Sequence, residues 1–139
     1  MKTTPFNFFV SFAILALLLL SCEVSTARLT DAKVCTTLTD NLCAEDMPVI
    51  SADAAELVAS CKLKNAPPET EVTFTWIYYG ENKIEIDAVT LNSGNEGSSM
   101  DLHSTLSRPH NGWPAGVYEV AMKILSGDKE PVVKQFSIQ

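Results

Sequence analysis

Apolar and polar residues alternate along most of the chain beyond residue 46, which indicates β-strands rather than helices. In residues 71–79, for example, large apolar side chains occupy every second position. A period of two places successive side chains on opposite faces of an extended chain, so one face of each strand is apolar. Clusters of glycine, proline and asparagine separate these runs. The pattern predicts strands at about 47–50, 57–64, 71–79, 83–91, 100–106, 116–125 and 131–138.

About seven short strands, with no helix longer than a turn, predict an all-β, antiparallel sandwich over residues 47–139. The bulky run at 71–79 is the expected central strand. We expect Trp76 and Tyr118 to anchor the core. The side chains expected around these two anchors are Phe74, Leu102, Val120 and Phe136.

The first 27 residues have the character of an export signal peptide. Lys2 precedes an apolar run over residues 8–20 that one serine interrupts. This run is too short to span a bilayer comfortably. Small residues at 25–27 suit a general signal peptidase, and cleavage there would leave Arg28 as the first mature residue.

A second cleavage site competes with the first, because residues 19–22, Leu-Leu-Ser-Cys, resemble a bacterial lipobox. In that alternative the signal peptide covers residues 1–21, and Cys22 becomes the mature N-terminus. Its thiol would carry diacylglycerol, and the acyl chains would tether the protein to the membrane surface. The sequence leaves both alternatives open.

Residues 28–46 are polar and lack an apolar period, so we expect an irregular tether that ends in a disulfide-closed loop. An exported protein can keep disulfides, and the chain has four cysteines. If Cys22 is lipidated or removed, Cys35 and Cys43 form the expected pair, which leaves Cys61 as a free, buried thiol. A zinc site is disfavoured, because these cysteines lack CxxC spacing and a nearby histidine.

The formal net charge of −7 arises from ten Lys and Arg against seventeen Asp and Glu. No run of basic residues interrupts this balance along the chain. The composition therefore argues against binding to nucleic acid, whose phosphate backbone attracts clustered cations. An acidic balance in a secreted domain mainly favours solubility.

Three residues carry a resemblance to immunoglobulin-like or fibronectin-III-like domains. Cys61 and Trp76 are fifteen positions apart on the expected second and third strands, where such domains place an inward cysteine and a core tryptophan. Tyr118 resembles the tyrosine corner at the start of their sixth strand. Val120 replaces the second cysteine of antibody domains, so the resemblance implies no inter-sheet disulfide. With its leader, the chain is similar to accessory domains of exported bacterial or archaeal proteins and lipoproteins.

Few residues in the sequence suggest catalysis or metal binding. His103 is expected on an outward strand face and His110 in a turn, and neither belongs to a catalytic motif. The chain also lacks a G-x-S-x-G elbow. Asn and Asp near residues 92–101 could suggest calcium, but turn formation explains them. We therefore predict no catalytic residue, no metal site and no cofactor.

The leading hypothesis is a non-enzymatic exported module that binds an unidentified protein or glycan at the cell surface, with the membrane reached only through Cys22. A carbohydrate-binding module is the main alternative, with Tyr79 and Trp113 as contact residues. Trp113 could instead close the end of the sandwich. A small secreted hydrolase or protease inhibitor is the third hypothesis. Arg108-Pro109 with Trp113 superficially resembles the loop of chagasin-like inhibitors, but here two strands follow it.

Overall fold

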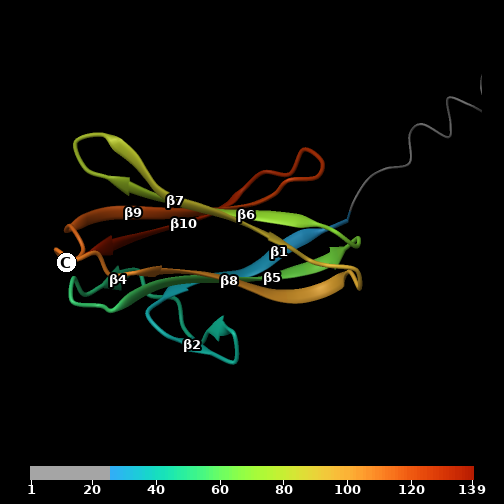
Figure 1. Ribbon diagram of the computed structural model, residues 1–139, viewed down its shortest axis with the longest axis horizontal. Helices are drawn as coiled ribbons and strands as arrows, with labels where there is room; N and C mark the ends of the chain where they lie inside the picture. Colours follow the sequence, from blue (N-terminus) through green and yellow to red (C-terminus); the bar gives the residue numbers. More distant parts are fainter. Residues whose placement is uncertain (1–25) are drawn as a thin grey trace, which may run out of the picture.

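The computed structural model describes residues 26–139, which form ten strands and no helix. The predicted lipidation residue Cys22 and nearly all of the predicted signal peptide lie outside this range. Two sheets stack face to face as the layers of a sandwich (Figure 1). None of the described residues belongs to a helix that could cross a membrane.

The two layers differ in size. The smaller sheet has the order β1 (Arg28–Cys35), β5 (Glu56–Ala66) and β8 (Ser98–Ser107). The larger sheet has the order β4 (Val49–Ile50), β10 (Val132–Ile138), β9 (Gly116–Ile124), β6 (Glu71–Tyr79) and β7 (Lys83–Asn92). A separate short hairpin consists of β2 (Leu38–Thr39) and β3 (Leu42–Cys43). Neighbouring strands are antiparallel except β4, which is parallel to β10.

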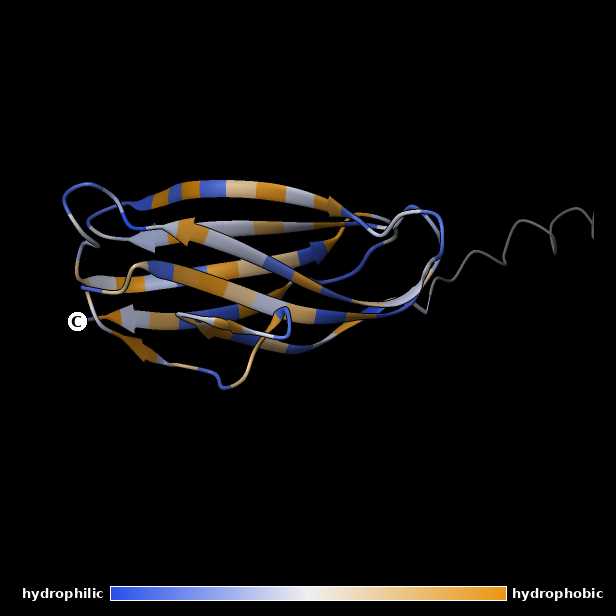
Figure 2. Ribbon diagram, turned by 60° about the horizontal axis from the view of Figure 1, so that its bottom comes forward, coloured by the Kyte–Doolittle hydropathy of each residue, from blue (hydrophilic) through white to orange (hydrophobic). Residues whose placement is uncertain are grey.

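The period-two alternation accounts for the core, and Figure 2 shows apolar and polar bands alternating along the strands. Trp76, Tyr118 and Phe74 are the largest fully buried side chains. The Trp76 indole N–H donates to the Ser104 hydroxyl at 3.0 Å, which joins β6 of one sheet to β8 of the other. The other predicted core residues, Leu102, Val120 and Phe136, are also buried, as expected.

The tyrosine corner expected at Tyr118 is present, since its hydroxyl donates to the Pro114 carbonyl at 2.7 Å. Gly116 lies between them with φ of 141°, a conformation that L-residues rarely adopt. A Cβ at this position would also lie 3.1 Å from the Tyr78 ring. Glycine therefore serves the turn that leads into β9.

The structure corrects the expectation for residues 28–46. The seven predicted strands are present as β4 to β10, but the supposed irregular tether contains three more. Strand β1 pairs antiparallel with β5 and belongs to the sandwich. Its register shifts between Thr30 and Lys33, and Asp31 there has a positive φ of 52°. This bulge breaks the two-residue period, which is why the sequence pattern concealed the strand.

Candidate functional site

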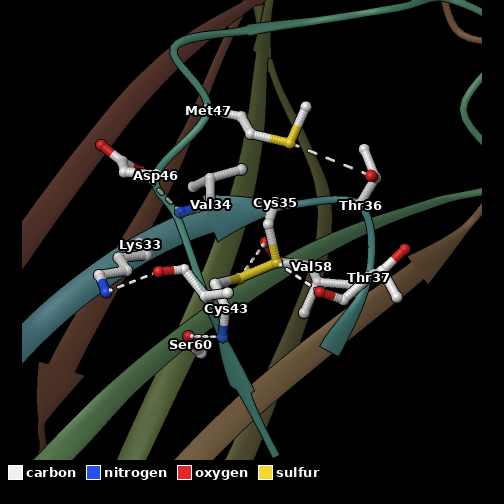
Figure 3. The surroundings of a disulfide bond; sticks show 11 residues. Lys33, Val34, Cys35, Thr36, Thr37, Cys43, Asp46, Met47, Val58 and Ser60 are labelled. Carbon is white, nitrogen blue, oxygen red and sulfur yellow. Dashed lines mark hydrogen bonds between the residues drawn. A yellow bond between two sulfur atoms is a disulfide. The ribbon is translucent and has the colours of Figure 1, made fainter. Parts of the chain in front are cut away.

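The predicted disulfide between Cys35 and Cys43 is confirmed, with an S–S distance of 2.05 Å (Figure 3). It joins the end of β1 to β3 and holds the β2–β3 hairpin against the outer face of the smaller sheet. Both cysteines pack with Val58, which is fully buried although it lies on that outer face. The Cys43 N–H donates to the Ser60 hydroxyl at 2.8 Å. The hairpin thus covers part of the smaller sheet.

Asp46 fixes the chain that leaves this hairpin. Its carboxylate accepts hydrogen bonds from the Val34 N–H at 2.8 Å and from Lys134 Nζ at 2.7 Å. Partial burial raises the pKa of Asp46, but the bonds from Lys134 and Val34 outweigh it, so the pKa lies below its ordinary value. The carboxylate therefore stays charged near neutral pH and ties the hairpin segment to β10.

The Cys61 thiol and the neighbouring residues Ser60 and His103 are the groups that could suggest a nucleophile, and burial disfavours both. Cys61 is a free, buried thiol, as predicted, and burial raises its pKa to about 12. It therefore stays protonated and weakly nucleophilic near neutral pH. His103 is the cross-strand neighbour of Ser60, but Ser60 is only 1% exposed and its hydroxyl already accepts the Cys43 N–H. A Ser–His pair open to substrate is not formed here.

The structure places Trp113 inside the molecule, which corrects its expected role as a ligand contact. Its side chain belongs to the main core, and its indole N–H donates to the Ala54 carbonyl at 2.7 Å. Trp113 therefore closes the sandwich, the alternative that the sequence also allowed. A buried ring with a satisfied N–H has no face to offer a sugar or a protein.

Tyr79 differs from Trp113, because it lies on the outer face of the larger sheet and is partly exposed. Its hydroxyl donates to Glu119 Oε2 at 3.2 Å, and Lys83 Nζ lies 5.8 Å from the ring centroid. An acidic and a basic group thus flank the aromatic ring. The two residues proposed as contacts do not share a surface, and Tyr79 keeps that role as a proposal.

A row of aligned residues crosses the outer face of the larger sheet at the level of Tyr79. Cross-strand partners face the same side, and the registers place one residue from each strand in the row. Val49 is 49% exposed and Val117 is 39% exposed. We call this set the outer row, and it consists of Val49, Ser137, Val117, Tyr79 and Lys83.

Sequence reasoning missed the outer row, although each strand carried part of the signal. The alternation in β9 places Val117 on the face opposite to Tyr118, and therefore on the outer side of the sheet. The sequence gives no register between strands, so it could not show that Val49 and Val117 align with Tyr79. A shallow hollow lined by Pro48, Val117 and Gln135 among others lies on the same part of the surface.

Within residues 26–139, no group of three metal-ligating side chains comes together. The described part of the chain is thus a helix-free β-sandwich with one disulfide, a buried free thiol and an exposed outer row on its larger sheet.

No protein-family model and no curated protein sequence matches this chain. Similar solved structures include an alkylpurine DNA glycosylase from Pseudomonas fluorescens bound to DNA, with 16% identity and a TM-score of 0.46 over 89% of this chain. A β-glucosidase from Erythrobacter marinus has 8% identity and a TM-score of 0.48 over 82% of the chain. β-Glucosidase 3B from Thermotoga neapolitana has 15% identity and a TM-score of 0.46 over 81%.

These similarities cover small parts of much larger proteins. The matched region spans 32% of the DNA glycosylase and 15% and 16% of the two β-glucosidases. At such low identities and TM-scores, the activities of those proteins carry no argument for this chain.

Proposed function

We propose that this chain is an exported, non-enzymatic, immunoglobulin-like module that binds a protein or glycan partner through the outer row of its larger sheet. The observation that carries the proposal is the alignment of Val49, Val117 and Tyr79 across an exposed sheet face. Exposed apolar and aromatic side chains release water when a partner covers them, and tyrosine is enriched among the residues that dominate binding energy.

The strand order and the core support the immunoglobulin-like part of the proposal. The smaller sheet (β1, β5, β8) packs against the larger one (β10, β9, β6, β7). The chain crosses between the two sheets several times, for example from β5 to β6 and from β8 to β9. Cys61 and Trp76 are both fully buried in the main core, and Tyr118 forms its corner bond. These are positions at which immunoglobulin-like domains place the same residue types.

Export is supported by the Cys35–Cys43 disulfide, since disulfides persist in oxidising compartments. We expect the intact mass of the protein from its native host to begin at Cys22 with added acyl chains, or at Arg28 without them. Either form should contain one disulfide and one thiol that reacts with an alkylating reagent only after unfolding, because Cys61 is buried. A mass that includes residues 1–21, with cysteines that are reduced and alkylated without prior reduction, would contradict export.

A glycan partner is favoured by the surroundings of Tyr79. A sugar presents apolar C–H faces and hydroxyl groups together, and sites for such ligands combine an apolar surface with a few placed polar groups. The Tyr79 ring, the Glu119 carboxylate and the Lys83 ammonium provide this combination. A protein partner would instead bury more of the apolar surface of the outer row, including Val49 and Val117.

Replacing Tyr79 by alanine should weaken partner binding at least tenfold, which corresponds to about 1.4 kcal/mol. Binding is measured with the labelled mature protein on host cells that lack their own copy, and in parallel on a glycan array. Thr73→Ala is the matched control, because Thr73 lies on the same face of β6 beyond the outer row.

The control variant should bind as the wild type does, and both variants should remain fully folded under the assay conditions, as circular dichroism measures. Equal binding by wild type and Tyr79→Ala would refute the outer row as the contact surface. A positive glycan array identifies a sugar partner, whereas binding to cells alone directs the search to a surface protein.

A further inference from the structure

Three basic residues gather on the outer face of the smaller sheet, although they are distant in sequence. Arg28 on β1 is the cross-strand partner of Lys64 on β5, and Lys62 lies two residues from Lys64 on the same face. The alternation in β5 directs Cys61 and Leu63 into the core, where both are fully buried. The lysines therefore point outward, and we call Arg28, Lys62 and Lys64 the basic cluster.

The basic cluster is unfavourable for the fold, because like charges directly opposite each other destabilise a sheet. Within residues 26–139, none of its three members forms an ion pair, whereas Lys134 pairs with Asp46. The one carboxylate in register is Asp101 on β8, opposite Lys62. Two further carboxylates lie nearby: Asp31 is exposed in the β1 bulge next to the partner of Lys62, and Glu130 lines a hollow with Arg28 and Lys129. Cations still outnumber carboxylates here, in a chain whose net charge is −7.

The basic cluster lies at the end of the sandwich where β1 begins. Figure 1 shows the start of β1, the end of β5 and the start of β8 at this end, and the C-terminus at the other. Arg28 is the sixth residue after Cys22, and six residues of extended chain span at most about 20 Å. An anchor at Cys22 would keep the basic cluster within this distance of the lipid surface.

We propose that the basic cluster docks the domain on an anionic phospholipid surface, with the lipid phosphates as counter-ions. The inference rests on the proposed export of the chain, and it deepens the proposed function by orienting the domain. Each Lys or Arg near an anionic membrane strengthens association about fivefold. Acyl chains combined with a basic patch give more stable anchoring than a single lipid chain alone.

The net negative charge of the domain does not prevent this docking. Sheets in a sandwich are about 10 Å apart, and the screening length at physiological ionic strength is about 8 Å. Carboxylates of the larger sheet are therefore largely screened from a membrane that contacts the smaller sheet. In this orientation the outer row, on the opposite layer, faces away from the lipid and toward a partner.

The test uses the mature protein with vesicles of phosphatidylglycerol mixed with phosphatidylcholine, and with phosphatidylcholine alone. Lysine acetylation followed by mass spectrometry reports the exposure of each amine, whether or not the chain carries acyl groups. We expect Lys62 and Lys64 to react at least fivefold more slowly on the anionic vesicles. Lys83 and Lys123 should react equally on both, and high salt should abolish the difference.

Charge reversal supplies a second measurement. Lys62→Glu should lower salt-sensitive association with anionic vesicles at least fivefold, whereas Lys123→Glu, an equal change of charge on the larger sheet and outside the outer row, should not. Equal labelling rates on both vesicle types, or equal losses in both variants, would overturn the proposal. So would protection of Lys62 and Lys64 on cells but not on vesicles, which would identify another polyanion.

The results of the vesicle experiments do not depend on whether the outer row binds a partner. A failure of membrane docking leaves the binding defect of Tyr79→Ala untouched, because the two surfaces belong to different sheets. A failure of export is read from the mature mass and does not alter the vesicle result.

Discussion

Replacing Trp76 by alanine is expected to lower the free energy of unfolding by about 3 to 5 kcal/mol, a large part of the stability of a small domain. Trp76 has no exposed surface and packs edge-on against Phe136, with ring centroids 6.3 Å apart. Its removal opens a cavity between the sheets and deletes the hydrogen bond to Ser104 that joins them. Chemical denaturation followed by circular dichroism measures the loss.

Two control variants separate the parts of this effect. Ser104→Ala keeps the packing but leaves the buried indole N–H without its acceptor, which should lower the free energy of unfolding by about 1 to 3 kcal/mol. Ile84→Ala should change it by no more than about 0.5 kcal/mol, because Ile84 is 52% exposed. A midpoint for Trp76→Ala as little shifted as that of Ile84→Ala would be incompatible with the core described above.

Removal of the disulfide is expected to give the second largest loss of stability. In the chain-entropy model, opening the short loop between Cys35 and Cys43 lowers the free energy of unfolding by about 2 to 3 kcal/mol. The Cys35→Ala/Cys43→Ala variant should also release the β2–β3 hairpin, because the bond between its two ends is gone. Val58, buried beneath the hairpin, would then become exposed to water.

Denaturation measures the overall loss, and hydrogen exchange measures the release of the hairpin. The amide at position 43, which donates to Ser60, should exchange much faster in the double variant. Cys61→Ala removes a thiol but no cross-link, so it serves as the control, and its hairpin amides should stay protected. If the hairpin of the double variant exchanges as slowly as that of the control, the disulfide does not hold it in place.

The strands of the sandwich were largely predictable, because each buries one face and exposes the other. The alternation in β6 and β9 identified the core positions, including Phe74 and Val120, without any knowledge of neighbouring strands. Strand β1 was hidden by its bulge, and the β2–β3 hairpin by its short strands. A pattern method needs several residues in one period, and these segments do not provide them.

The candidate surfaces were less predictable than the fold. The sequence left Trp113 open as a ligand contact or as a residue that closes the sandwich. Only the structure shows that its indole N–H donates to Ala54, 59 positions away in sequence. The basic cluster combines residues more than thirty positions apart, so a search for runs of charge along the chain could not detect it.

The sequence by itself determined the all-β character, the core anchors Trp76 and Tyr118, and the pairing of Cys35 with Cys43. Each of these depends on local alternation, residue bulk or short separation along the chain. Only the tertiary structure decided which outward residues become neighbours, as in the outer row and the basic cluster. The physical reason is that alternation fixes the face of a residue within its own strand, whereas register and sheet order fix which strands lie beside it.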